Sequence, residues 1–200
     1  MIGFFGGSFD PVHFGHLKNA VSLKNALDLS ELFLMPCAAP VHKNKLNFSN
    51  DQRLEMLQLA VEEFSELSID LREINRGSAS YTIESLIDIK REYPNTPICL
   101  IIGMDSFINL QSWKDWQDFH QYIHLVVIAR PDYQAPKDLT HSFVPTESIT
   151  ELHNQTAGLL YFDNTKLLDI SSSGIQGKIS AQQSLSGLLP ESIIHYLQHL

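Results

Sequence analysis

Two histidines near the N-terminus, His13 and His16, stand three positions apart and follow a glycine pair and a proline. Residues at this spacing share one face of a helix, so both imidazoles can point into the same space. A helix that begins here also presents its first backbone N–H groups and the positive end of its dipole. Gly6 and Gly7 let backbone N–H groups approach an anion with no side chain in between. We therefore expect a site that stabilises negative charge on phosphate oxygens.

This loop differs from two familiar phosphate-binding patterns. No Gly-Lys-Ser/Thr follows the glycines, which argues against a P-loop hydrolase, and the Gly-x-Gly-x-x-Gly of NAD dehydrogenases is also missing. A lone His-x-x-His pair is common on protein surfaces and forms half of many zinc sites. The attached run Gly6-Gly7-Ser8-Phe9-Asp10-Pro11 favours a phosphate site over both alternatives.

Short apolar strands alternate with amphipathic helices along the chain, which predicts an α/β fold. We expect strands at residues 1–5, 32–35, 67–74, 98–102, 125–129 and 159–162. We expect helices at residues 14–27, after a capping box at 49–52, at 82–93, from 171 and from Pro190 at a first helical position. The helix after the capping box carries Leu54, Leu57, Val61 and Phe64 at helical spacing. Residues 131–157 are weakly patterned and resemble a surface excursion.

The predicted architecture is a Rossmann-like, doubly wound parallel sheet with flanking helices. It forms a single domain over residues 1–200, with a helical C-terminal part at about 171–200. Polar clusters directly follow four of the strands, at residues 6–16, 36–45, 103–105 and Arg130. Ligands of such sheets bind beyond the carboxyl ends of the strands, where the strand order reverses. These clusters therefore predict one ligand site at that edge.

The composition limits the partners. A formal net charge of −9 argues against nucleic acid, so an anionic substrate must be met by a local group of cations. Cys37 and Cys99 have no close spacing, which is typical of reduced thiols in a cytoplasmic protein. We expect no signal peptide and no membrane partner, because the apolar runs are far shorter than a bilayer span. The sequence does not decide between a monomer and a homo-oligomer.

Two segments resemble the signatures of the nucleotidylyltransferase superfamily. Residues 6–16 are similar to its H-x-G-H element, and residues 170–176 are similar to its C-terminal signature. Within the superfamily the chain resembles the bacterial nicotinate-nucleotide adenylyltransferases. Four further segments carry this finer resemblance: residues 40–43, Arg76 with 80–82, 103–105 with Leu110 and 113–116, and 130–131. The resemblance extends from residue 2 to about 180.

The resemblance implies transfer of AMP from ATP to nicotinate mononucleotide, which yields nicotinate adenine dinucleotide and pyrophosphate. The phosphate of the mononucleotide would attack the α-phosphorus in line, without a covalent enzyme intermediate, and Mg²⁺ would be carried on the ATP phosphates. One alternative is an adenylyltransferase for another substrate on the same fold, nicotinamide mononucleotide or pantetheine phosphate. Another is a non-catalytic nucleotide-binding module.

The resemblance also implies roles for the matching residues, with His13 and His16 as the catalytic pair. The implied ATP-binding residues are Gly6, Gly7, Ser8, Phe9, His13, His16, Arg130, Ser171, Ser172 and Ser173. Those implied for nicotinate mononucleotide are His42, Lys43, Ser80, Tyr81, Thr82, Asp105 and Trp113. Several of these have a purely structural alternative: Tyr81 and Thr82 as a helix cap, Trp113 as a core residue, Asp105 as a strand-end cap, and residues 42–43 as a solvated loop.

Two positions depart from the family pattern. Gln176 stands where the C-terminal signature usually has Arg, so a bidentate cation for the triphosphate is missing there. Arg130 would then carry more of that charge. Val41 stands where family members often have a second proline, which affects only loop stiffness.

Overall fold

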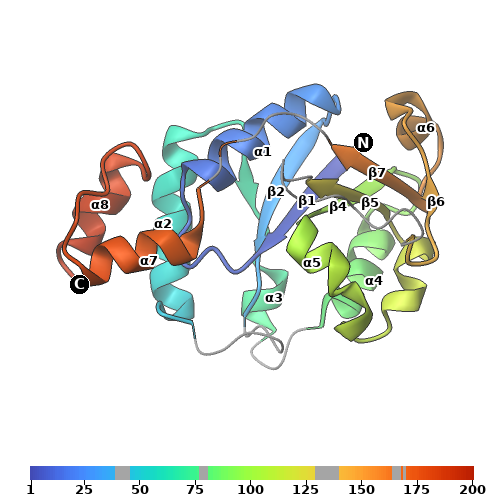
Figure 1. Cartoon of the computed structure of the whole chain (residues 1–200). Coiled ribbons are helices and arrows are strands. Elements are labelled where there is room, and N and C mark those ends of the chain that lie inside the picture. The colour runs from blue at the N-terminus through green and yellow to red at the C-terminus, as the bar shows by residue number, and fades with distance from the viewer. Residues whose placement is uncertain (39–45, 77–80, 129–139, 164–167, 169) are drawn as a thin grey trace.

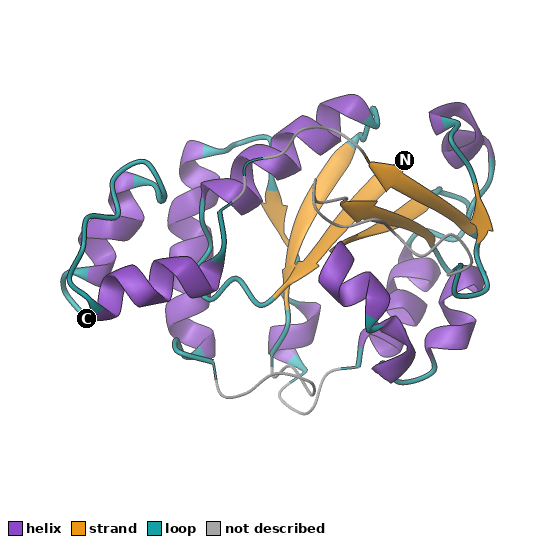
Figure 2. Ribbon diagram, viewed as in Figure 1, coloured by secondary structure: helices purple, strands orange, loops and turns teal. Residues whose placement is uncertain are grey.

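β1 (Ile2–Gly7) is an interior strand of a seven-stranded parallel sheet with helices on both faces (Figures 1 and 2). This computed structural model describes residues 1–38, 46–76, 81–128, 140–163, 168 and 170–200. The other strands are β2 (Glu31–Pro36), β3 (Ser68–Ile69), β4 (Ile98–Gly103), β5 (His124–Ile128), β6 (Val144–Pro145) and β7 (Leu159–Asp163). Their order, β3-β2-β1-β4-β5-β7-β6, with every neighbouring pair parallel, confirms the doubly wound prediction.

Two hydrophobic cores lie on the two faces of the sheet, because successive strand residues point to opposite sides. Phe5 belongs to the core that α1 and α2 cover, and its neighbour Phe4 belongs to the core under α4 and α5. The helices are α1 (Phe14–Ala26), α2 (Asn50–Glu63), α3 (Arg72–Asn75), α4 (Thr82–Glu92), α5 (Met104–Ile108), α6 (Ile149–Asn154), α7 (Ser172–Ser180) and α8 (Glu191–Leu197). Two 3₁₀ turns, η1 (Leu110–Ser112) and η2 (Trp116–Gln121), follow α5.

The strand order reverses between β1 and β4. The chain that leaves β1 enters α1 on one face of the sheet, and the chain that leaves β4 enters α5 on the other. In open α/β sheets this divergence is where ligands bind. The fold therefore brings the loop after β1, with both histidines, to the expected place.

Three expectations about local structure are wrong. Residues 67–74 form only the two-residue β3 and then turn into α3, where the backbone N–H of Arg72 donates to Asp70 Oδ1 at 2.9 Å. Of residues 131–157, the described part from 140 onward contains β6 and α6, which are too short to show a hydrophobic period. Pro190 is the N-cap of α8 and not its first helical residue.

The C-terminal helices α7 and α8 lie beside α1 and α2 at one end of the molecule (Figure 1). The Ser192 hydroxyl donates to Glu63 Oε1 at 2.6 Å, and the Phe14 backbone N–H donates to the Leu188 carbonyl at 2.9 Å. The second bond holds the segment between α7 and α8 against the start of α1. No helix in the described part of the chain is long and apolar enough to cross a bilayer.

A buried carboxyl group, that of Glu73, joins α3 to α4. The Ser85 hydroxyl donates to Glu73 Oε1 at 3.1 Å, and Arg76 donates to the same hydroxyl at 3.0 Å. Burial raises the pKa of Glu73 to about 7, although the Ser85 bond and the charge of Arg76 act in the opposite direction.

This raised pKa predicts that the unfolding free energy of the wild type falls as the pH rises, and that Glu73→Gln abolishes this fall. Between the ordinary pKa of 4.5 and about 7 the unfolded chain releases a proton that the folded protein keeps. The wild type should therefore lose up to about 3 kcal/mol of unfolding free energy relative to the variant as the pH rises through this window. Urea unfolding of both proteins at pH 5 and pH 8 measures the difference. A difference that is the same at both pH values would contradict the assignment.

Candidate active site

His13 defines the start of α1. Its backbone is extended (φ −151°, ψ 170°), and its Nδ1 accepts the backbone N–H of His16 at 3.2 Å, as a serine or aspartate oxygen does at other helix starts. A ring nitrogen that accepts this bond carries no proton, which leaves Nε2 as the His13 atom that can donate. The first turn of α1 contains no acidic residue, which keeps the helix N-terminus favourable for anions.

The two imidazoles lie against each other. Their ring centroids are 3.7 Å apart with an interplanar angle of 22°. Phe9 packs edge-on to His16 at 4.9 Å, while His13 itself is only 2% exposed. Two cationic rings at this separation would repel each other. The structure thus brings both predicted catalytic side chains to one point.

A sharp turn at Phe9 separates β1 from the histidines. Phe9 has a φ of 47°, in the left-handed region, and its side chain is fully buried. A Cβ at Gly7 would lie 3.0 Å from the Phe9 ring, so the ring folds back onto the end of β1 only because residue 7 is glycine. The turn sends the chain across the carboxyl end of the sheet toward α1.

Arg53 of α2 lies beneath this turn and is fully buried. Nη1 donates to the Ser8 carbonyl at 2.6 Å, and Nη2 donates to the carbonyls of Cys37 and Ala38 at 2.7 and 3.2 Å. A fourth bond reaches Asn50 Oδ1 at 2.7 Å. No ion pair to Arg53 occurs within the described ranges. Burial lowers the pKa of this guanidinium, a shift that the nearby groups of Cys37 and Asp10 partly oppose.

The sequence interpretation missed Arg53. The predicted face of its helix was Leu54, Leu57, Val61 and Phe64, but the buried residues are Arg53, Met56, Leu57 and Ala60. A prediction from hydrophobic periodicity treats arginine as a polar residue and therefore places it on the solvent-facing side of the helix. The carbonyl oxygens at the ends of β1 and β2 supply the acceptors that let it turn inward. An arginine one turn inside a capped helix, next to an apolar stripe, is the only local sign.

Asp10 is the second anchor of the loop and is 4% exposed. Oδ1 accepts the backbone N–H of Phe48 at 2.9 Å, and Oδ2 accepts that of Asn47 at 3.0 Å. Gln176 of α7 donates to the same Oδ2 at 2.9 Å. The carboxylate therefore ties the loop to the entry of α2 and to α7.

α7 begins next to α1, and Ser171 caps it by accepting the Gly174 backbone N–H at 3.2 Å. The Ser172 hydroxyl donates to the Pro11 carbonyl at 3.2 Å. A Cβ at Gly15 would lie 2.9 Å from the Ile170 carbonyl oxygen, so the two helix starts approach each other across this glycine. The predicted helix start at residues 171–174 is confirmed, and Ser173 is exposed on its first turn.

α4 supplies a third helix N-terminus. Tyr81 is its N-cap, with no capping hydrogen bond from that side chain, and Thr82 is the first helical residue, so these two residues open the helix as predicted. Lys114 Nζ lies 4.3 Å from the centroid of the Tyr81 ring and 3.3 Å from Glu84 Oε1. Trp113 is half-buried and packs edge-on to Phe119 at 6.2 Å, so part of its ring belongs to the core.

Asp105 is exposed on the first turn of α5, directly after β4. Gly6 and Gly7 are the last residues of β1, where they pair with Met35 and Pro36 of β2. Four of the predicted site residues, His42, Lys43, Ser80 and Arg130, lie outside the described residues.

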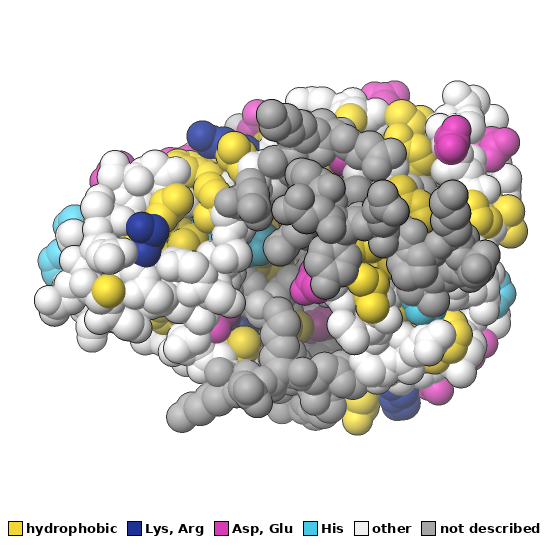
Figure 3. Space-filling view, viewed as in Figure 1, with side chains coloured by type: hydrophobic (Ala, Val, Ile, Leu, Met, Phe, Trp, Pro, Cys, Tyr) yellow, Lys and Arg dark blue, Asp and Glu magenta, His cyan; other side chains and the backbone are white. Residues whose placement is uncertain are grey.

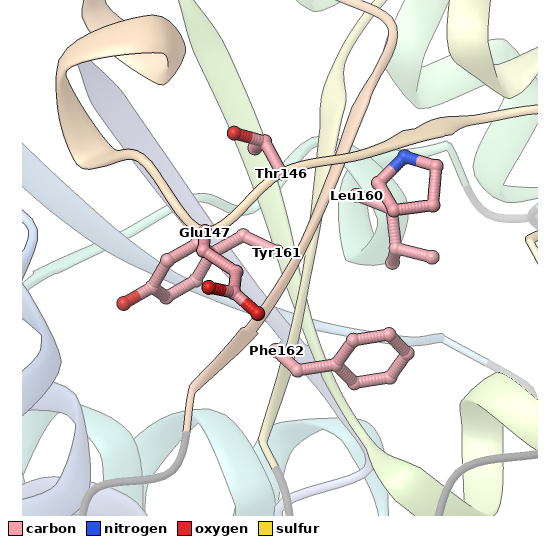
Figure 4. A pocket seen from close by; sticks show the side chains of 6 residues that line it. Thr146, Glu147, Leu160, Tyr161 and Phe162 are labelled. Atoms are coloured by element: carbon pink, nitrogen blue, oxygen red, sulfur yellow. The ribbon is translucent and has the colours of Figure 1, made fainter. Parts of the chain in front are cut away.

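A cavity of about 720 Å³ lies at the opposite, β6–β7 end of the sheet (Figure 4). Tyr161 and Phe162 point to opposite sides of β7, and Glu147 lies beside Tyr161. None of the residues that line this cavity is a predicted site residue, and the Glu147 carboxylate would repel a phosphate. In the view of Figure 3 the visible Lys and Arg side chains are scattered and form no single patch. The described residues also contain no group of three or more side chains that could hold a metal ion.

Comparison with known proteins gives a consistent set of relatives. The sequence pattern of the cytidylyltransferase-like family matches residues 4–178. The chain is 56% identical, over its full length and 95% of the relative, to the probable nicotinate-nucleotide adenylyltransferase of Vesicomyosocius okutanii. It is 42% identical, over its full length and 96% of the relative, to the protein of that name from Psychromonas ingrahamii.

The fold has a close match among solved structures. The nicotinic acid mononucleotide adenylyltransferase of Plasmodium falciparum, complexed with NaAD, superposes with a TM-score of 0.74 at 19% identity. The match covers 99% of this chain and 94% of the other. At this identity the likeness concerns the fold.

The contact between the two helix starts predicts opposite effects for two glycine substitutions. Gly15→Ala forces the Ile170 carbonyl or the His13 ring to move, and it should lower the unfolding free energy by about 1–3 kcal/mol. Gly177→Ala, in α7, is the matched control: nothing lies within 4 Å of its Cβ, so it should raise stability by about 0.5–1 kcal/mol. Denaturant unfolding checks both, and an equal effect of the two changes would contradict the close approach at Gly15.

Proposed function

Because the chain belongs to the nicotinate-nucleotide adenylyltransferase family of cytidylyltransferase-like proteins, we propose that it transfers AMP from ATP to nicotinate mononucleotide. The products are nicotinate adenine dinucleotide and pyrophosphate, which places the enzyme in NAD biosynthesis. The observation that carries this proposal is the pair of stacked histidines at the start of α1, next to the start of α7.

The triphosphate of ATP binds at this junction in our proposal. His13 donates from Nε2, His16 lies against it, and the first backbone N–H groups of α7, around residues 171–173, face the anion. Gly6, Gly7, Ser8 and Phe9 line the site through their backbone. Arg130 adds a cation, as the family pattern implies. These contacts offset the charge that builds up on the phosphate oxygens during transfer.

Nicotinate mononucleotide binds on the α4 side. The uncapped N-terminus of α4, with Tyr81 and the Thr82 hydroxyl, suits the nicotinate carboxylate. The exposed part of Trp113 stacks on the pyridine ring, and Asp105 holds a ribose hydroxyl. His42, Lys43 and Ser80 complete this half of the site by the family pattern.

The reaction needs no nucleophile from the protein, because the phosphate of the mononucleotide attacks the α-phosphorus directly. Burial raises the pKa of the Cys99 thiol to about 12, so this cysteine does not compete as a thiolate. Catalysis then consists of positioning and charge stabilisation. A Mg²⁺ ion carried by the phosphates supplies further charge neutralisation and needs few protein ligands. The protein's two cysteines, Cys37 and Cys99, are not joined in a disulfide, which suits the cytoplasm, where we place the enzyme.

A paired-substrate assay tests the proposed function. The protein is incubated with ATP, Mg²⁺ and one acceptor, and pyrophosphate release is followed. We expect release with nicotinate mononucleotide and much slower release with nicotinamide mononucleotide or pantetheine phosphate. Faster release with either of these two would reassign the acceptor. ATP binding with no release from any acceptor would favour a non-catalytic module.

His16→Ala should lower the turnover number by about 10²–10³-fold, because it removes a donor to the developing charge. His199→Ala, at an exposed position after α8, is the control and should leave turnover unchanged. Steady-state rates of pyrophosphate release measure both. A loss of less than threefold for His16→Ala would remove this side chain from the mechanism.

A further inference from the structure

We infer that Gln176 is a positioning residue for the ATP site, which holds the start of α7 against the loop after β1 through hydrogen bonds to Asp10. The inference rests on the proposed function, since it gives this junction the triphosphate to bind. It concerns the position where the family signature usually has Arg.

Gln176 lies one turn inside α7 and is half-buried. Long side chains in helices point back toward the N-terminus. Here the amide group reaches the loop, where Nε2 donates to the Asp10 backbone carbonyl and, at 2.9 Å, to Asp10 Oδ2. One NH₂ group thus bonds to the main chain and the side chain of a single loop residue.

Two other contacts fix the same helix start. Ser172 donates to the Pro11 carbonyl, and the Ile170 carbonyl lies close against Gly15. Together with Gln176, these contacts run along the loop from residue 10 to residue 15. Of the three, only the Gln176 contact reaches a charged group. A carboxylate strengthens a hydrogen bond, so this is the strongest of the three contacts.

The neutral amide suits this place. Asp10 is almost fully buried and already accepts the backbone N–H groups of Asn47 and Phe48. Gln176 adds a donor to the carboxylate without adding a charge. The substitution of the usual Arg therefore replaces a cation for the phosphates with a clamp on the loop. The phosphates are left to the helix starts and the two histidines.

Two substitutions test the clamp. Gln176→Leu removes both donors at similar volume, and Gln176→Glu places a second carboxylate next to Asp10. We expect the dissociation constant of ATP to rise about 10-fold for the first and about 100-fold for the second. The dissociation constant of nicotinate mononucleotide should change less than twofold. Titration calorimetry with each ligand alone measures both dissociation constants, and thermal unfolding of each variant verifies that it is folded at the titration temperature.

The same changes at Gln183, exposed just beyond α7, serve as matched controls and should affect neither ligand. The inference is overturned if both Gln176 variants bind ATP within twofold of the wild type. It is also overturned if affinity for the two ligands falls in parallel, or if ATP does not bind the wild type. Failure of the proposed function shows separately, as ATP binding by the wild type without pyrophosphate release from nicotinate mononucleotide.

Discussion

A buried guanidinium that bonds to backbone carbonyls sets the shape of this site. Arg53 donates hydrogen bonds to the carbonyl oxygen of Ser8, just after β1, and to those of Cys37 and Ala38, just after β2. Loss of a hydrogen bond to a buried polar group costs about 1–3 kcal/mol, so these bonds from Arg53 favour the observed course of the chain. The chains that leave two neighbouring strands are thus held at a fixed separation, and Asp10 does the same for the entries of α2 and α7.

This arrangement explains how an acidic protein can bind two anionic nucleotides. The chain carries a net charge of −9, so its overall field opposes phosphate. Close to the loop the balance differs: Arg53 is buried with neutral acceptors, the first turn of α1 has no carboxylate, and the Asp10 carboxylate accepts four hydrogen bonds. In the proposed complex, the dipoles of two helix starts act on the phosphates at short range.

Local sequence patterns predicted much of the fold and of the site. They did not predict the contacts between segments that are distant in the sequence. The histidine spacing, the capping box at Ser49 and the parallel sheet depend on near neighbours or on periodicity, and all three are confirmed. The Arg53 bond to Ser8 joins positions 45 apart, and the Gln176 bond to Asp10 joins positions 166 apart. A single sequence shows Arg53 as a polar helix residue and Gln176 as a missing cation, because neither partner is visible until the chain folds.

Because the bonds from Arg53 and those to Asp10 join groups of the protein alone, we propose that the phosphate site is already formed before ATP binds. The most direct measurement is a crystal structure of the protein with a non-hydrolysable ATP analogue. We expect triphosphate oxygens within hydrogen-bond distance of His13 Nε2 and of the first backbone N–H groups of α7. The bonds from Arg53 to Ser8 and Cys37 should be intact. A triphosphate bound elsewhere, or a loop that has broken its bonds to Arg53, would contradict the proposal.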